Sequence, residues 1–200
     1  ARYYAEEVRK ELIERYGEEG LYKGGLSVRT TLNPNLQRIA VQALRNGLEA
    51  YDRRHGWRGP IANIDVTGGW LGSLNSVSQP KGLGSWQLAV VRKISAKYAE
   101  IGVIDGSLGI IPLTELKWAR LWLKGENLGP RIKVATDVLK IGDVIAVEGF
   151  AGESDGAKCV NRCYTLRQIP EIDGALIAMD PHTGRVLAMV GGYDYNKNFN

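Results

Sequence analysis

The C-terminal part of the sequence most constrains what this chain can fold into. Two runs rich in Val, Leu, Ile and Met, residues 175–179 and 186–190, flank a Pro-His-Thr-Gly turn at 181–184. This pattern predicts a β-hairpin whose strands are too apolar for one face to lie in water. Because the sequence stops at Asn200, we expect the covering layers to lie in sequence absent here, and the chain to be a fragment of a longer protein.

Composition fits a soluble globular chain of one or two domains, with hydrophobic and charged fractions near the average. The net charge of +4 is mild, and lysines and arginines are interspersed with carboxylates along the chain. We therefore expect a solvated surface rather than a nucleic-acid-binding face. No apolar run reaches the length of a membrane span, and no signal sequence opens the chain.

The first third of the chain predicts two helices with a short strand between them. Apolar residues at helical spacing predict a helix over 3–16, ended by Gly17, in which Glu6 with Lys10 and Glu11 with Arg15 form supporting pairs. Residues 26–32 alternate and predict a strand. Asn33 and Pro34 then open a second helix that runs to about Tyr51.

The middle of the chain predicts a small barrel. Alternation predicts strands over 86–94, 98–104, 108–112, 144–150 and 164–169, with an Asp105-Gly106 hairpin turn. A short helix over 113–122, with Trp118 and Trp122 on one face, separates the third strand from the fourth. Three strands, a helix and two strands is the order of the partly open, five-stranded OB barrel. The fold class is therefore mixed α/β, mainly β.

Two segments resemble a known family. Residues 166–192, which include Met-Asp-Pro-His-Thr-Gly and Val-Leu-Ala-Met-Val-Gly-Gly, are similar to the opening of the transpeptidase domain of class A, bifunctional penicillin-binding proteins. Residues 24–37, Gly-Gly-Leu-Ser-Val-Arg-Thr-Thr-Leu-Asn-Pro-Asn-Leu-Gln, resemble the same family's linker. The two matches bracket the chain in the expected order.

The resemblance implies an organisation and a role. It implies an interdomain linker over 1–56, an OB-like domain over 57–168, and a truncated transpeptidase start over 169–200. The longer protein would polymerise and cross-link peptidoglycan from the periplasmic side of the inner membrane, anchored by a transmembrane helix not in this chain. The OB-like domain would be a non-catalytic spacer and interaction module that docks peptidoglycan or an envelope regulatory protein.

The catalytic nucleophile implied by the resemblance would lie past Asn200. Penicillin-reactive enzymes carry Ser-x-x-Lys, Ser-x-Asn and Lys-Thr-Gly, and here Ser78–Lys81, Ser73–Asn75 and His182–Gly184 imitate them. Pro80, Gly82 and Gly84 interrupt the first segment, whereas the chemistry needs Ser and Lys on one turn of a helix. We therefore expect no catalytic residue here. The carboxylates at positions 6, 7, 18 and 19 are expected to be solvated.

The tryptophans leave alternative roles open for the barrel. It could bind an oligosaccharide through Trp70, Trp86, Trp118 or Trp122. It could also bind single-stranded nucleic acid through aromatic rings and the cations Arg92, Lys93 and Lys97, although we expect no nucleic-acid partner. Burial in the core is the default for most of these rings, above all Trp118 and Trp122, and Trp70, in a Gly-rich loop, is the best candidate for exposure. The candidate binding residues are Trp70, Trp86, Arg92 and Lys93.

Cys159 and Cys163 are the remaining candidate site. Three residues separate them, so a tight turn could bring their sulfurs within bonding distance, whereas a continuous strand would not. A disulfide and two free thiols are both compatible with the sequence. We expect no metal site, because further ligands are lacking near this pair, and no cofactor.

Overall fold

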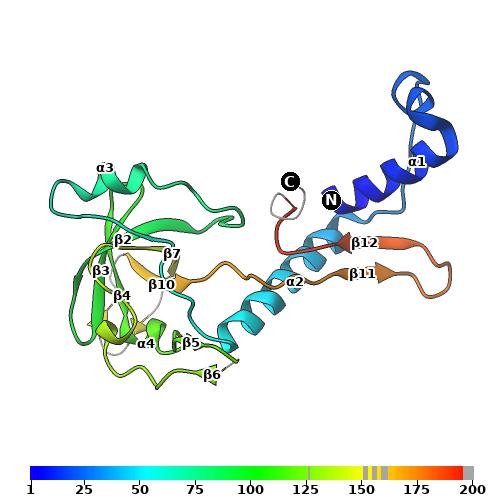
Figure 1. Cartoon of the computed structure of the whole chain (residues 1–200). Helices are drawn as coiled ribbons and strands as arrows, with labels where there is room; N and C mark the ends of the chain where they lie inside the picture. The colour runs from blue at the N-terminus through cyan, green and yellow to red at the C-terminus, as the bar shows by residue number, and fades with distance from the viewer. Residues whose placement is uncertain (126, 151–152, 155–156, 159–161, 196–200) are drawn as a thin grey trace. The chain divides into compact units, whose positions relative to one another are not determined.

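The computed structural model describes residues 1–125, 127–150, 153–154, 157–158 and 162–195. The chain divides into two compact units, one formed by Ala1–Leu48 with Pro170–Asn200 and the other by Glu49–Ile169. The second unit is thus an insertion, in sequence, between the two segments of the first (Figure 1). We call them the hairpin unit and the barrel unit. The boundaries expected after residues 56 and 168 stay predictions.

Five strands of the barrel unit close on themselves, which confirms the predicted barrel (Figure 1). They follow the order β2-β3-β4-β10-β7, and β7 pairs again with β2 to complete the ring. Only β4 and β10 run parallel among these pairs. The strands are β2 (Gln87–Ile94), β3 (Tyr98–Val103), β4 (Leu108–Pro112), β7 (Asp143–Phe150) and β10 (Cys163–Arg167). A two-residue strand, β1 (Ala62–Asn63), extends the sheet along β7.

The predicted strand limits lie within about two residues of those observed, because the local signals are strong. The β3–β4 connection is the predicted Asp105-Gly106 turn, in which the Ser107 N–H donates to Asp105 Oδ1 at 2.8 Å. The Val103 N–H donates to the Ser107 carbonyl at 2.8 Å and closes the hairpin. A polar side chain bonding to the backbone two residues on is typical of Asp in turns.

The barrel core is made by the inward side chains of the five strands. Alternate residues of β3 and β7, such as Ile101 and Ile145, are fully buried, as is Leu166 on β10. The outward residues Leu88 and Val90 of β2 are buried as well. The helix α3 (Trp70–Asn75) contacts β2 and β3. Residues 88–91 of β2 are therefore all apolar and buried, rather than alternating as predicted, because both faces of the strand are covered.

The predicted helix over 113–122 is wrong beyond its first turn. The helix α4 spans only Leu113–Leu116, and residues 122–128 instead form a hairpin of β5 (Trp122–Leu123) with β6 (Asn127–Leu128). The Trp57 N–H donates to the Arg120 carbonyl, and the Trp122 N–H donates to the Trp57 carbonyl. This long-range bridge holds the chain extended where its local pattern favours a helix.

Three short elements complete the barrel unit. A 3-10 helix, η1 (Ala135–Asp137), precedes β7, and β8 (Glu153–Ser154) pairs antiparallel with β9 (Ala157–Lys158) between β7 and β10. The side chain of Asp137 accepts bonds from the backbone N–H groups of Lys133 and Val134, and these bonds lower the pKa of its carboxyl.

In the hairpin unit, the first helix is interrupted where the sequence predicts. The element α1 spans Arg2–Lys23, but Gly17 has φ 69° and ψ 169°, so the helix stops there and resumes for one more short segment. The predicted strand over 26–32 is wrong: all these residues are described and none lies in a strand. Thr31 Oγ1 donates to the Val186 carbonyl at 2.6 Å, and Leu26 and Val28 are exposed. A strand needs a neighbouring ladder, which this segment does not have.

The second helix and the hairpin form the core of the hairpin unit. The helix α2 (Pro34–Arg54) begins as predicted, with Asn33 Oδ1 accepting bonds from the Asn35 and Leu36 N–H groups, and it ends three residues later than expected. The strands β11 (Leu176–Met179) and β12 (Val186–Val190) pair antiparallel. Ala40 of α2 packs with Ala188 and Val190 of β12.

The sequence predicts that the layers covering this hairpin lie outside the chain. This is wrong for one face of the hairpin, because α2 covers it. The side-chain amide of Gln37 forms two hydrogen bonds with the backbone of β12. It donates to the Met189 carbonyl and accepts from the Met189 N–H, both at 3.0 Å. Ile177 and Met179 of β11 are each 55% exposed.

Candidate interaction surfaces

Trp70 and Arg92 are brought together by the fold on the outer side of the barrel. Trp70 opens α3, and its ring lies directly over Gly102 of β3, where a Cβ atom would come within 2.7 Å of the ring carbons. The Arg92 guanidinium lies 5.4 Å from the ring centroid, the distance of a cation–π contact. Trp70 is half-buried, which differs from the exposed ring expected from its Gly-rich loop. The ring is packed onto the strand below it.

Lys93 and Trp86 lie in different surroundings from this pair. Lys93, the next residue of β2, is exposed and forms a long ion pair of 3.8 Å with Glu100. Trp86 is only 8% exposed, with the Arg167 guanidinium 5.5 Å from its ring centroid. Arg167 in turn binds Glu148 through Nε at 2.9 Å. Trp86 is thus part of the packed interior rather than a platform for a ligand.

The remaining tryptophans divide between core and surface. Trp57 is 4% exposed, and Trp118 packs edge-on against it with ring centroids 5.9 Å apart. The Arg53 guanidinium lies 4.6 Å from the Trp118 ring. The structural role expected for Trp118 is therefore confirmed. The same expectation is wrong for Trp122, which is 44% exposed on β5, because β5 is a strand and not the continuation of a helix.

The residues that imitate penicillin-reactive motifs are not arranged for catalysis. Ser78 and Lys81 lie beyond the end of α3 and outside any helix, so no helical turn places the amine under the hydroxyl. His182 and Thr183 lie in the turn between β11 and β12, where their N–H groups donate to Asp180 Oδ1. The His182 N–H, with the Thr183 side chain, lowers the pKa of the Asp180 carboxyl.

Three carboxylates of the first helix pair with neighbouring cations: Glu7 and Glu11 are exposed, as expected for Glu7, whereas Glu6 is half-buried. Glu6 binds Arg9, and Glu7 binds Lys10, rather than the expected pair of Glu6 with Lys10, whereas Glu11 pairs with Arg15 as predicted. The Arg9 hydrogen bond lowers the pKa of the Glu6 carboxyl. A lowered pKa suits an ion pair and not a general acid at neutral pH.

Cys163 is buried at the start of β10. Cys159 lies outside the described residues, so a disulfide between the two cysteines, one of the two alternatives that the sequence leaves open, stays a prediction. Among the residues that the structure describes, no group of three or more His, Cys, Asp or Glu side chains could hold a metal ion.

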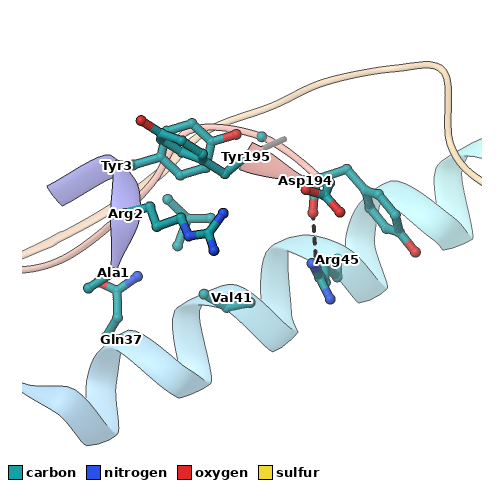
Figure 2. Close-up of a pocket in the computed structure, with 11 residues that line it drawn as sticks. Ala1, Arg2, Tyr3, Gln37, Val41, Arg45, Asp194 and Tyr195 are labelled. Atoms are coloured by element: carbon teal, nitrogen blue, oxygen red, sulfur yellow. Dashed lines mark hydrogen bonds between the residues drawn. The ribbon is translucent and has the colours of Figure 1, made fainter. Parts of the chain in front are cut away.

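A pocket of about 330 Å³ lies in the hairpin unit between α2 and the end of the hairpin (Figure 2). Arg45 of α2 donates from Nε to the Tyr193 carbonyl at 3.0 Å, and the rings of Tyr3 and Tyr195 meet edge-on at 5.0 Å. None of its described lining residues is a serine, cysteine, threonine or histidine.

Sequence reasoning missed a buried polar cluster in the barrel unit. Asp52, near the end of α2, is 3% exposed and accepts bonds from Arg58 Nη1 at 2.6 Å and Gln168 Nε2 at 2.7 Å. Arg58 also donates to the Ile169 carbonyl, and Gln168 to the Gly56 carbonyl. The cluster ties the segment that leads into the barrel to the segment that leaves it. Gln168 lies more than a hundred residues from Asp52 and Arg58, so no local pattern reveals the cluster.

Within the described parts of the chain, none of the helices has the length and apolar character needed to cross a bilayer.

Comparison with known proteins gives consistent results. Residues 57–172 match the family described as the penicillin-binding protein OB-like domain. The chain is 45% identical over 197 residues to penicillin-binding protein 1A of Rickettsia typhi, covering 98% of this chain and 22% of that protein. It is 33% identical over 202 residues to penicillin-binding protein 1A of Escherichia coli, again spanning 22% of the relative's length. The crystal structure of penicillin-binding protein 1A from Haemophilus influenzae superposes with a TM-score of 0.65 at 27% identity, over 98% of this chain and 26% of that one.

Proposed function

Because this chain belongs to the penicillin-binding proteins and carries their OB-like domain, we propose that it is the non-catalytic linker and OB-like spacer and interaction region of a bifunctional peptidoglycan synthase. In this proposal the longer protein combines a glycosyltransferase with a penicillin-sensitive D,D-transpeptidase. The barrel either sets the distance of the transpeptidase from the polymerising domain or docks a partner, for which peptidoglycan and an envelope regulatory protein are the candidates. The setting is the periplasmic side of the bacterial inner membrane.

The observation that carries this proposal is the closed barrel itself. It has its own buried core, and it is inserted between the two sequence segments of the hairpin unit. Its described residues include no serine and lysine on a shared helical turn. A domain with a complete core and no such constellation suits spacing and docking better than chemistry.

A fluorescent penicillin is expected to leave this chain unlabelled. Covalent labelling needs a serine hydroxyl whose proton is taken by a nearby base, and Ser78 and Lys81 lie outside any helix. The measurement is in-gel fluorescence of the purified chain, with an intact penicillin-binding protein as the positive control. Labelling that disappears in Ser78→Ala would overturn the non-catalytic role.

Oligosaccharide binding is the second candidate, and the Trp70–Arg92 pair is the observation that favours it. A half-buried aromatic ring beside a guanidinium can contact both a sugar face and an anionic group. Single-stranded nucleic acid would use the same chemistry.

Intrinsic tryptophan fluorescence separates these roles. The chain is titrated with soluble peptidoglycan fragments and, in parallel, with a single-stranded oligonucleotide. For the spacer or protein-docking role we expect neither ligand to change the signal. A saturable change with glycan alone that is reduced in Trp70→Ala would instead make the barrel a substrate-holding module. Trp57→Phe, which alters a buried ring, is the matched control.

A further inference from the structure

The hairpin formed by β5 and β6 exposes three consecutive large apolar side chains. Leu121 is 53% exposed, Trp122 is 44% and Leu123 is 41%. Isolated exposed apolar residues are ordinary on protein surfaces, whereas larger groups of them mark interaction sites, and these three residues are consecutive in the sequence. We call residues 117–133, which contain β5, β6 and the segments on either side of them, the Trp122 hairpin.

Cations flank this apolar group in the sequence. The Trp122 hairpin contains five lysines and arginines and one carboxylate, a net charge of +4, which equals the net charge of the whole chain. The side chain of Arg120 is used internally, and the other four cations, Lys117, Lys124, Arg131 and Lys133, are all exposed. Apart from this hairpin, positive and negative charges in the chain balance.

The exposed side chains are held in place by backbone and side-chain bonds at the base of the hairpin. Residue 121 forms a β-bridge with Trp57, and the Gly129 N–H donates to the Leu121 carbonyl at 2.8 Å. Arg120 Nε donates to the Gly129 carbonyl at 2.7 Å. The folded barrel thus presents Leu121, Trp122 and Leu123 outward.

We propose that the Trp122 hairpin docks on the surface of an anionic phospholipid bilayer. Tryptophan and leucine flanked by lysine and arginine are the side chains that insert at the boundary between headgroups and acyl chains, while the cations meet acidic headgroups. A glycan would engage the Trp122 ring and the cations but would leave Leu121 and Leu123 in water. The family resemblance implies membrane contact only through parts of the longer protein outside this chain, whereas the Trp122 hairpin would add a contact within it.

The test is co-sedimentation of the purified chain with vesicles. We expect binding to vesicles of phosphatidylglycerol and phosphatidylcholine in equal parts, weak binding to phosphatidylcholine alone, and loss of binding as salt is raised. Each cation near a charged surface adds about 1 kcal/mol, so Lys124→Gln with Lys133→Gln should weaken partitioning roughly 25-fold. Trp122→Ala should weaken it about tenfold.

Matched controls come from the same unit. Leu108 is 49% exposed on β4, and Lys140 is an exposed cation of the barrel unit, so Leu108→Ala and Lys140→Gln should leave vesicle binding unchanged. Acyl-chain-brominated lipids should quench part of the tryptophan emission of the unaltered chain, and that part should vanish in Trp122→Phe.

Three results would overturn the proposal. These are the absence of vesicle binding, equal binding to both lipid compositions, and vesicle binding that survives the Trp122 and lysine substitutions. Binding to soluble poly-glutamate but not to vesicles, lost in Lys124→Gln with Lys133→Gln, would assign the hairpin to an acidic protein partner instead.

Discussion

Replacing Asp52 by alanine is expected to lower the free energy of unfolding of the barrel unit by about 3 kcal/mol. The carboxylate is almost fully buried and binds both Arg58, at 2.6 Å, and Gln168, at 2.7 Å. Its removal deletes this ion pair from a guanidinium that is only 24% exposed. It also removes the acceptor that Gln168 Nε2 shares with Arg58, so one of the links between the segments before and after the barrel is lost.

Urea unfolding followed by tryptophan fluorescence measures the free energy of unfolding of the barrel unit, because all five tryptophans lie in this unit, between residues 57 and 122. Asp52→Asn keeps an acceptor for Gln168 but loses the charge, so it should lie between the original chain and Asp52→Ala. The matched control is Glu100→Ala, which breaks the exposed pair with Lys93 and should change stability by less than about 0.5 kcal/mol. A change equally small for Asp52→Ala would show that the buried cluster does not stabilise the barrel.

The barrel strands could be predicted because their signals are local. Alternation of apolar residues marks the inward face of β3, a run of apolar residues marks β7, and Asp105 with Gly106 marks the turn between β3 and β4. The order of three strands, a helix and two strands then leaves few topologies. The Asn33 cap and Gly17 break are local signals of the same kind.

The errors arise where partners distant in sequence decide the conformation. Residues 120–122 are extended because they pair with Trp57, although Trp118 and Trp122 have helical spacing. Residues 26–32 alternate like a strand but have no ladder to join. Local periodicity does not determine either outcome.

The candidate surfaces were predictable only in part. Trp70 and Arg92 do come together, but the degree of burial of each tryptophan depends on packing that the sequence does not reveal. The excess of cations over 117–133 could have been counted from the sequence. The exposure of Trp122 beside those cations required the fold, because a helical Trp122 would have been expected in the core.

Leu166→Ala is expected to lower the free energy of unfolding of the barrel unit by about 3 kcal/mol, within the range for leucine truncation in a core. Leu166 is 0% exposed on β10, the strand that pairs with both β4 and β7 and so closes the ring. Its side chain packs in the same cluster as Ile101, Ile145 and Val147. Truncation removes apolar contacts and leaves a cavity that the hydrogen-bonded ring cannot collapse to fill.

Leu108→Ala, which removes the same atoms from a side chain 49% exposed on β4, is the control and should cost well under 1 kcal/mol. Both variants are followed by tryptophan fluorescence in urea, so that unfolding of the barrel unit is what is measured. If Leu166→Ala unfolds at the same urea concentration as Leu108→Ala, β10 does not close a packed barrel. If the expected difference appears, the barrel owes its stability to its own core, as a spacer or docking module of a longer protein requires.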